Sequence, residues 1–286
     1  MTSKITILVV MISALALLAS CGSSGIVQGV KRESLYDRVM HSGTIRCSYL
    51  ACAPYCIKDP NSGELSGIFV EAMETVGRKL GLKVVWTGEV GYESLFEGLN
   101  SDRYDVFAGG LWPNASRAKA ADFSIPIYYG AVKAYGRSDE KRFENNLDAI
   151  NASDVRIAVI DGAMEDLVAR TDFPKAKRVS LTQLSPFSQE LLNIATGKAD
   201  VTFADPAIVN LFLKKNPGTL KELAARPVRV FGNTFVFKSD ETRFKRVLDI
   251  TLEEMLNSGE IDKLLKKYEP YPGAYYRVAL PYRTGP

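Results

Sequence analysis

The fold is decided by residues 44–108, which open with the extended run Thr44-Ile-Arg-Cys-Ser-Tyr49 and continue with Phe69-Val-Glu-Ala-Met-Glu-Thr-Val-Gly-Arg-Lys-Leu-Gly81. The apolar residues of the second stretch recur at helical spacing and stop at the glycine, which predicts a helix after a strand. Residues 84–86 predict a second strand, residues 92–99 a second helix, and residues 105–108 a third strand. Strands that alternate with helices in this way indicate an α/β fold.

The same alternation resumes further along the chain. Residues 155–160 and 201–203 predict strands, and the apolar positions of 191–195 and 208–213 predict helices. The segment Ser101-Asp-Arg-Tyr-Asp-Val106 resembles Thr196-Gly-Lys-Ala-Asp-Val201, and each lies between a predicted helix and a predicted strand. Two lobes with a similar helix-to-strand unit would explain this echo, although six residues can also match by chance.

The end of the chain predicts two helices and a tail. Apolar residues recur at spacings of three and four through 244–256 and again through 261–268. Residues 270–286 are rich in proline and tyrosine. Proline interrupts a helix, so an irregular strap is expected there.

Length and charge exclude several classes of protein. The chain has 286 residues, 46% of them hydrophobic, with 36 Lys or Arg, 33 Asp or Glu and a single His. Such a chain can bury one large core or two smaller ones, which excludes a disordered, collagen-like or coiled-coil protein. The two signs of charge are nearly balanced and form no basic stripe, so nucleic acid is not an expected partner.

The first twenty residues have the pattern of an export signal. Lys4 precedes an uncharged apolar run from Ile5 to Leu18, which is short for a membrane span and typical of a secretory signal. The tetrad Leu18-Ala-Ser-Cys21 resembles the bacterial lipobox, in which the cysteine is acylated and becomes the first mature residue. Residues 1–20 are then a lipoprotein signal peptide and residues 21–35 a tether. The alternative is an ordinary signal peptide with an incidental cysteine.

Three cysteines remain beyond Cys21, and an odd number cannot pair fully within one chain. Cys52 and Cys56 are close enough in sequence for a small loop disulfide in an oxidising compartment, whereas Cys47 falls in a predicted strand and is expected to be a buried thiol. The spacing of these cysteines and His41 is poor for zinc, so no metal site is expected.

Several junctions between the predicted elements match a known family. They are Gly43-Thr-Ile-Arg46, Pro54-Tyr55, Gly63-Glu-Leu-Ser-Gly-Ile-Phe-Val-Glu71, Lys79-Leu-Gly-Leu82, Ser116-Arg-Ala-Lys-Ala-Ala-Asp-Phe-Ser-Ile-Pro-Ile-Tyr128, Ile157-Ala-Val-Ile-Asp-Gly162 and Ala199-Asp-Val-Thr-Phe-Ala-Asp205. Over about residues 36–268 the chain resembles the family 3 extracellular solute-binding proteins, the polar amino-acid receptors of ABC importers. The block from Arg117 to Tyr128 is the most specific part of this resemblance.

The resemblance implies a two-lobe, type II periplasmic-binding-protein fold with a ligand cleft between the lobes. Lobe 1 is expected to comprise residues 36–130 plus 236–270, lobe 2 residues 131–235, and the C-terminal tail residues 271–286. Crossing strands are expected near 131–136 and 228–237. A lipid-anchored monomer on the periplasmic or cell-surface face of a bacterial membrane, without a cofactor, would close over its ligand and deliver it to an ABC permease.

The family motifs place candidate ligand-binding residues on this sequence. Arg117 stands where the family grips the ligand carboxylate, and a guanidinium can hold a carboxylate through two parallel hydrogen bonds. The alternative is a surface arginine paired with an acid such as Asp122. Asp205 matches the acid that receives the ligand ammonium, but it precedes a proline and could instead cap a helix. Gly162 and Ala163 begin a predicted helix whose amides could bind the far side of the carboxylate, the alternative being a plain turn between a strand and a helix.

Aromatic and glycine positions complete the expected site. Tyr55 and Trp112 could form walls around an apolar or cationic ligand side chain, although aromatic residues are more often in the core. Gly109 and Gly110 would let the ligand approach the backbone. Two departures weaken the assignment of an amino-acid ligand, because family members usually have Thr at the position of Trp112 and Ser or Thr at that of Ala163. An opine, a keto acid, an amine or a peptidoglycan fragment therefore remain alternatives.

An enzyme and a sensor component are alternatives of a different class. Periplasmic prephenate and arogenate dehydratases resemble this family and would need an acid that protonates a leaving hydroxyl. Glu71 or Glu165 could serve, but nothing in the sequence singles one out, and His41 lies outside the expected cleft. A receptor that presents its closed form to a sensor protein instead of a permease would have the same cleft.

Overall fold

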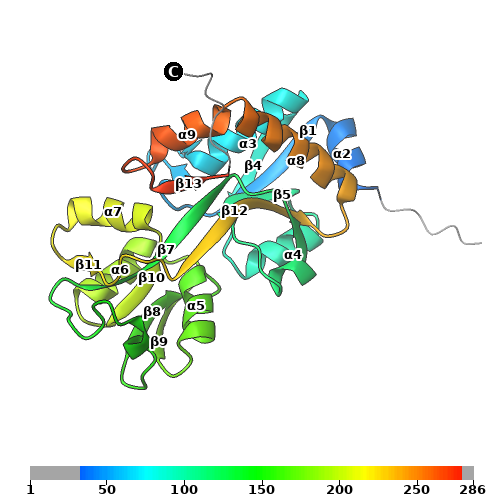
Figure 1. The fold of residues 1–286 in the computed structure, drawn as a ribbon. Helices are drawn as coiled ribbons and strands as arrows, with labels where there is room; N and C mark the ends of the chain where they lie inside the picture. Colours follow the sequence, from blue (N-terminus) through cyan, green and yellow to red (C-terminus); the bar gives the residue numbers. More distant parts are fainter. Residues whose placement is uncertain (1–32, 279–286) are drawn as a thin grey trace, which may run out of the picture. The chain divides into compact units, whose positions relative to one another are not determined.

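One mixed β-sheet runs through both lobes of the protein (Figure 1). The computed structural model describes residues 33–278. The main path of the sheet has the strand order β4-β1-β5-β12-β7-β10-β8-β9. Its two central strands, β7 (Tyr128–Arg137) and β12 (Arg229–Lys238), pair antiparallel with each other at residues 128–132 and 229–233.

These two strands join the lobes, because each continues into both of them. Beyond the shared segment, β12 pairs with β5 (Val106–Leu111) and β6 (Ala121–Phe123) on one side. The other end of β7 pairs with β10 (Val201–Ala204) and β11 (Leu220–Glu222). The predicted crossings near 131–136 and 228–237 fall on these strands, apart from residue 228, and the two-lobe α/β fold is confirmed. The lobe limits 36–130 plus 236–270 and 131–235 stay a prediction.

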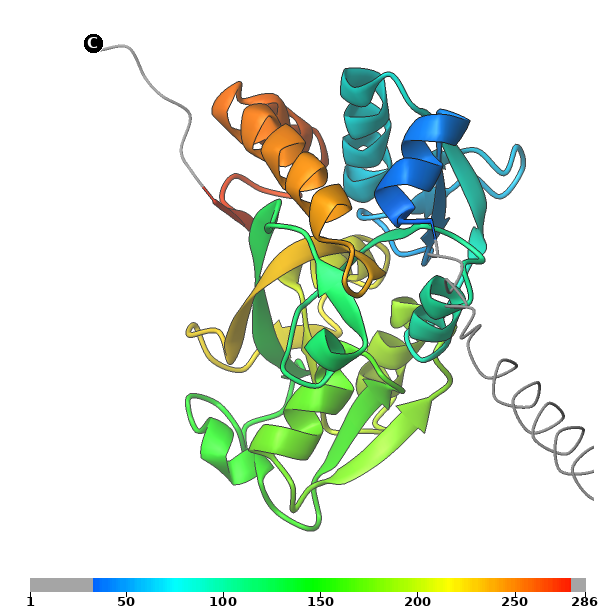
Figure 2. The same cartoon turned by 90° about the vertical axis from the view of Figure 1, so that its right-hand side faces the viewer.

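The first lobe surrounds the parallel strands β1 (Thr44–Tyr49), β4 (Lys83–Glu89) and β5. Its helices are α2 (Leu35–Ser42), α3 (Ile68–Leu80), α4 (Ser94–Asn100), α8 (Thr242–Asn257) and α9 (Glu260–Tyr268), together with the short β2 (Ile57–Lys58), β3 (Leu65–Ser66) and η1 (Arg117–Lys119). Helices α2, α3 and α8 lie together over one face of the sheet (Figure 2). As predicted, α3 ends at Gly81, which adopts the left-handed conformation with φ of 67°.

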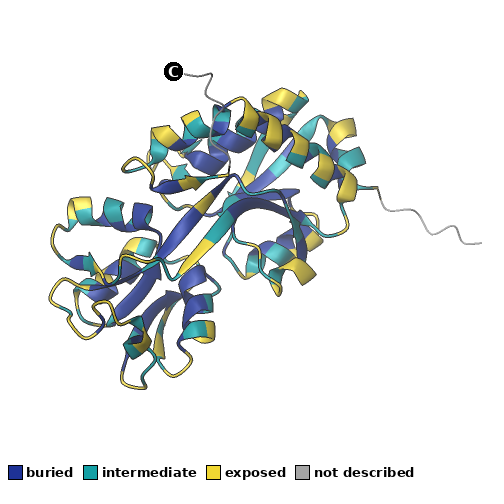
Figure 3. Ribbon diagram, viewed as in Figure 1, coloured by how far each residue is buried: buried dark blue, intermediate teal, exposed yellow. Residues whose placement is uncertain are grey.

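The second lobe places helices on both faces of its strands. It contains β8 (Arg156–Ile160), β9 (Lys177–Leu181), β10, β11, α5 (Met164–Asp172), α6 (Phe187–Ala195), α7 (Pro206–Lys215) and η2 (Leu147–Ile150). Along β8, Ile157 and Val159 face one buried cluster with α5, and Ala158 between them faces a second cluster with α6 and α7. Strands covered on both faces are buried along most of their length, as Figure 3 shows for β8 and β10. This burial explains the continuous apolar runs of the sequence.

The described part of the tail is more regular than predicted. Residues 275–277 form the strand β13 (Tyr275–Arg277), which pairs antiparallel with residues 128–130 of β7. Tyr275 is buried against Tyr55 and Tyr128, and Arg277 forms ion pairs with Asp262 and Glu269. β13 thus pairs with one edge of β7. A prediction based on the proline content of the tail misses this strand.

The structure describes three of the cysteines but not the predicted export signal. Cys47, Cys52 and Cys56 are free thiols in the structure, and the backbones of Cys52 and Cys56 exchange two hydrogen bonds of 2.8 and 2.9 Å. Their pairing as a disulfide therefore stays a prediction. Cys21 and the signal segment lie outside the described residues. Within residues 33–278, no helix has the length and hydrophobicity to cross a membrane, and no cluster of side chains has the composition of a metal site.

Candidate functional site

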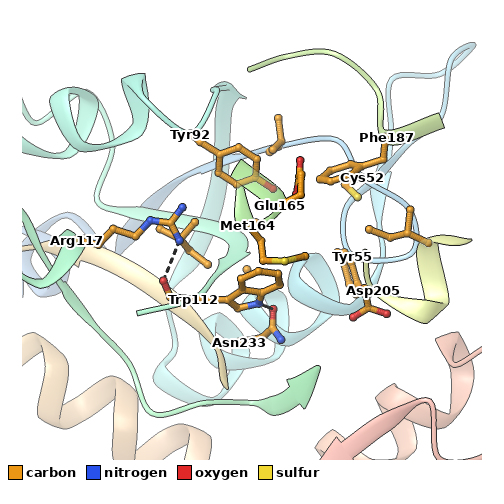
Figure 4. Close-up of a pocket in the computed structure, with 15 residues that line it drawn as sticks. Cys52, Tyr55, Tyr92, Trp112, Arg117, Met164, Glu165, Phe187, Asp205 and Asn233 are labelled. Atoms are coloured by element: carbon orange, nitrogen blue, oxygen red, sulfur yellow. Dashed lines mark hydrogen bonds between the residues drawn. The ribbon is translucent and has the colours of Figure 1, made fainter. Parts of the chain in front are cut away.

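A cavity lies between the two lobes, and side chains from both of them line it (Figure 4). Its lining residues are Leu50, Cys52, Tyr55, Tyr92, Gly109, Gly110, Leu111, Trp112 and Arg117 from the first lobe, Met164, Glu165, Phe187, Asp205 and Ile208 from the second, and Asn233 from β12. Most are apolar or aromatic, and three carry a guanidinium or carboxyl group, which is the usual character of a small-molecule site. The loops that follow β1, β5, β8 and β10 supply many of them, at the carboxyl ends of those strands.

The end of β5 brings the backbone and an aromatic ring to the cavity. Gly110 has φ of +75°, and a Cβ there would lie 2.3 Å from the Phe69 ring, so only glycine fits. The indole of Trp112 stacks on Phe231 of β12 with ring centroids 4.6 Å apart. Its Nε1 donates a hydrogen bond of 2.8 Å to Asn233 Oδ1. Trp112 is therefore a wall of the cavity that is fixed against a crossing strand.

Arg117 reaches from the first lobe to the second. Its Nη1 donates to the Trp112 carbonyl at 2.9 Å, and its Nη2 donates to the Gly162 carbonyl at 2.8 Å (Figure 4 shows the bond to Trp112). Among the residues that the structure describes, no acid forms an ion pair with Arg117. Burial lowers the pKa of its guanidinium, and Tyr92 and Glu165 oppose that effect. The remaining guanidinium donors are thus available to an anion in the cavity.

Asp205 both caps a helix and lines the cavity. It follows β10 and precedes Pro206, and its Oδ1 accepts the Ala207 amide at 2.7 Å. Only 4% of the residue is exposed. Burial raises the pKa of Asp205 to about 6, although the Ala207 amide acts in the other direction. The cap uses only one carboxylate oxygen, so it does not exclude the ligand-binding role, which stays a prediction.

Glu165 is a second buried acid at the cavity. It lies in the first turn of α5, it has no exposed surface, and its Oε1 accepts the Ile160 amide at 3.0 Å. Its Oε2 is buried without a hydrogen-bond partner. Burial raises the pKa of Glu165 to about 8. The sequence suggests Glu165 only as one of two acids for an enzyme, because nothing in a single sequence shows that the side chain is buried.

The structure brings five of the seven predicted ligand-binding residues to this cavity, namely Tyr55, Gly110, Trp112, Arg117 and Asp205. Gly162 and Ala163 do not line it. The Gly162 amide points to Asp166 Oδ2 at 3.4 Å, and the Ala163 amide donates to the Ile160 carbonyl at 3.0 Å. In the structure, Gly162 contributes its carbonyl to Arg117, so its role as an anion donor stays a prediction.

Sequence reasoning misses several residues of the cavity. Tyr92, Met164, Phe187 and Asn233 line it, but none belongs to a motif that the sequence singles out for binding. Tyr92 lies in the loop before α4 of the first lobe, and Phe187 is the first residue of α6 in the second. That both line one cavity depends on how the lobes close on each other, which local sequence patterns do not encode.

Comparison with known proteins agrees with this architecture. Residues 45–270 match the bacterial extracellular solute-binding proteins, family 3. The probable amino-acid-binding protein YxeM of Bacillus subtilis is 24% identical over 93% of this chain and 94% of its own length. The cyclohexadienyl dehydratase of Pseudomonas aeruginosa is 27% identical over 91% of this chain and 94% of its own length.

Solved structures show the same fold. An ancestral amino acid-binding protein described as a precursor of cyclohexadienyl dehydratase has a TM-score of 0.73 at 21% identity, covering 83% of this chain and all of its own. The solute receptor for L-cysteine of Neisseria gonorrhoeae also has a TM-score of 0.73, at 16% identity, covering 85% of this chain and 99% of its own. With its two lobes, its crossing strands and its interlobe cavity, the chain belongs to the family 3 bacterial extracellular solute-binding proteins.

Proposed function

We propose that this protein is a lipid-anchored receptor that captures a small amino-acid-like solute outside the cytosol for an ABC importer. The observation that carries the proposal is the buried guanidinium of Arg117, which faces the interlobe cavity and, within residues 33–278, forms hydrogen bonds only with two backbone carbonyls. A guanidinium that is buried away from water and is not neutralised by an acid is suited to bind a ligand carboxylate.

The names of the relatives support an amino-acid ligand. They include a probable amino-acid ABC transporter-binding protein of Haemophilus influenzae and the L-cystine-binding protein TcyA of Bacillus subtilis. In this chain the Arg117 guanidinium would hold the carboxylate, and Asp205 would receive an ammonium with the oxygen that does not cap α7. Tyr55 and Trp112 would flank the ligand, and Gly110 would admit it to the backbone.

Ligand capture would use a hinge in the two crossing strands. Few hydrogen bonds in the structure cross directly between the cavity-facing loops of the lobes. Two of them are Arg117 Nη2 to the Gly162 carbonyl at 2.8 Å and the Glu93 amide to Gln183 Oε1 at 2.9 Å. Opening at β7 and β12 would break both, and closing over a ligand would restore them. The Gly162 and Ala163 amides could donate hydrogen bonds to the ligand only if they gave up their present acceptors, Asp166 Oδ2 and the Ile160 carbonyl.

The anchor belongs to the same proposal. Acylation at Cys21 and the tether of residues 21–35 would hold the two lobes at a membrane surface, next to the permease. A monomer suffices, since one chain contains both walls of the cavity. The Cys21→Ser variant is expected to leave the membrane fraction, as measured by fractionation and immunoblotting. Continued membrane association of that variant would contradict the anchor.

The decisive experiment removes the guanidinium. Arg117→Ala is expected to weaken binding of an L-amino acid identified by a thermal-shift screen at least a hundredfold, because the ligand carboxylate would then be buried without a counter-charge. Isothermal titration calorimetry gives the affinity. The matched control is Arg103→Ala, since Arg103 lies on the surface and pairs with Glu97. Unchanged affinity in Arg117→Ala would exclude the proposed role, provided that its thermal unfolding is unchanged.

One observation favours a second candidate function. Glu165 is a buried carboxyl that keeps its proton at neutral pH and lines the cavity with Arg117. Such a group can act as a general acid, and one relative is named a cyclohexadienyl dehydratase. Incubation of the purified protein with prephenate distinguishes the two functions. Formation of phenylpyruvate that is lost in Glu165→Gln would establish the enzyme, whereas binding of an amino acid without turnover supports the receptor.

A further inference from the structure

The cavity contains an acid whose second oxygen has no partner in the protein. Glu165 is fully buried, its Oε1 is bound to the Ile160 amide, and its Oε2 is buried without a hydrogen bond. In Figure 4 its carboxyl group lies between the rings of Tyr92 and Phe187, on the side of the cavity away from Asp205. An unsatisfied buried oxygen is costly, so such a position in a binding cavity calls for a ligand group that donates to it.

The charges that line the cavity do not match a neutral amino acid. One cationic group, Arg117, faces two carboxyl groups, Glu165 and Asp205. Figure 4 shows Arg117 and Asp205 on opposite sides of the cavity, with Trp112 and Met164 between them. A buried carboxylate needs a positive partner. A ligand that carries one carboxylate and two positive groups would supply a partner to all three.

We propose that the ligand is an amino acid with a cationic side chain, and that Glu165 is the specificity-determining residue that binds one of its two positive groups. This inference rests on the proposed receptor function and names the ligand class of the same cavity. Tyr92 and Phe187 line the cavity beside Glu165, and an aromatic ring can stabilise a cation that lies over its face. The resulting subsite comprises Glu165, Tyr92 and Phe187, and we call it the Glu165 subsite.

Binding at this subsite couples to the release of a proton. Without ligand, Glu165 keeps its proton at neutral pH because of burial and because the carboxyl groups of Asp166 and Glu190 lie nearby, while Arg117 favours the ionised form. Tyr92 and Cys52 are the other titratable groups that interact with it, and Asp205 acts on Cys52. An arriving cation stabilises the carboxylate, so the Glu165 proton passes to the solvent.

Calorimetry with matched ligand pairs tests this inference on the purified wild-type protein. L-Arginine and L-lysine carry a side-chain charge, whereas L-citrulline and L-norleucine have nearly the same shapes without it. At least one cationic amino acid is expected to bind at least tenfold more tightly than its neutral counterpart, as a charge-assisted hydrogen bond allows. Titrations at pH 7 in phosphate and in Tris buffer should show release of close to one proton per bound cation, and none at pH 9.

The variant Glu165→Gln assigns the effect to its residue. It should abolish both the preference for the cation and the proton release. Glu253→Gln, on the exposed face of α8, is the matched control. Should Glu165→Gln fail to fold, the selectivity and proton release of the wild-type protein still decide the matter.

The outcomes separate this inference from the receptor function. Equal affinity for cationic and neutral amino acids, or cation binding without proton release, would overturn the role of Glu165 and leave the receptor function standing. Binding of no amino acid of either kind would overturn both. A cation preference that persists in Glu165→Gln would assign the subsite to another acid and would also overturn the inference.

Discussion

Each lobe contains an aspartate that accepts hydrogen bonds from the amide and the guanidinium of one arginine. In the first lobe, Asp105 accepts the Arg46 amide at 2.7 Å and the Arg46 guanidinium at 2.8 Å. In the second lobe, Asp200 accepts the Arg156 amide at 2.9 Å and the Arg156 guanidinium at 3.0 Å. Each aspartate lies just before a strand, Asp105 before β5 and Asp200 before β10. Each arginine belongs to the strand that pairs in parallel with it, Arg46 to β1 and Arg156 to β8. The echo in the sequence therefore reflects a shared unit.

The second arginine at each aspartate shows how the lobes differ. Asp105 also pairs with Arg38 of α2 and is nearly inaccessible, with 3% of the residue exposed. Asp200 also pairs with Arg142, from the loop after β7, and is partly exposed. The same unit is thus inside the first lobe and close to the surface of the second.

The opposite ends of the strands carry the functional difference. At the cavity the first lobe presents a guanidinium, that of Arg117, whereas the second lobe presents two carboxyl groups, those of Glu165 and Asp205. The helix-to-strand units are alike, but the loops at the carboxyl ends of the strands differ in the sign of their charge. The scaffold and the proposed ligand recognition are therefore set by different segments of the same lobes.

The largest expected effect comes from variants that remove the aspartate of this shared unit in one lobe at a time. Asp105→Ala should lower the free energy of unfolding by about 4 kcal/mol, because it leaves the Arg46 amide and two partly buried guanidinium groups without their acceptor. Asp200→Ala should cost about 1–2 kcal/mol, since water can replace its partners at the surface. Urea denaturation followed by circular dichroism measures both. Equal losses would show that burial does not distinguish the two aspartates.

A second pair of variants tests whether the tail strand belongs to the core of the first lobe. Tyr275→Ala should lower the free energy of unfolding by about 3 kcal/mol, because it opens a cavity beside Tyr55 and Tyr128. The neighbouring Tyr276 points outward and is 42% exposed, so Tyr276→Ala should change it by less than about 0.5 kcal/mol. Thermal unfolding of the two variants provides the measurement. A small effect at Tyr275 would mean that β13 is an accessory to β7.

The sequence predicts the repeated scaffold better than the cavity. Apolar periodicity marks β1, α3, β8 and α8, because one buried face or one buried run suffices to define them. It misses β9, whose residues 177–181 are mostly exposed or partly exposed, and β13, whose short length carries no pattern. Arg117 and Asp205 were predicted from family motifs at junctions between elements. The burial of Glu165, the partner of Trp112 and the convergence of Tyr92 and Phe187 on one cavity depend on contacts between distant segments.

The smallest expected effect is the pH dependence of stability, which should have opposite signs for Glu165 in the cavity and Asp200 in the scaffold. Burial raises the pKa of Glu165 to about 8, so the folded protein binds its proton more tightly than the unfolded chain does between about pH 4.5 and 8. Stability without ligand should therefore fall by about 1–2 kcal/mol as the pH rises from 6 to 8. Asp200 has the opposite sign: burial opposes ionisation, but the bonds from Arg156 and Arg142 prevail and lower its pKa. Its contribution is present above the pKa of the unfolded chain and is lost only in acid.

The variant Glu165→Gln isolates the contribution of the cavity. It should reduce the loss of stability between pH 6 and 8, of which the buried Glu190, whose pKa burial also raises, contributes a further part. Asp200→Asn should instead reduce only the loss of stability in acid. Urea denaturation at pH 4, 6 and 8 measures both losses. A wild-type protein that is equally stable at pH 6 and 8 would mean that Glu165 is ionised or solvated in the unliganded state. In that case the cavity would be charged before the ligand arrives, and the two lobes would attract each other through Arg117 and Glu165 without it.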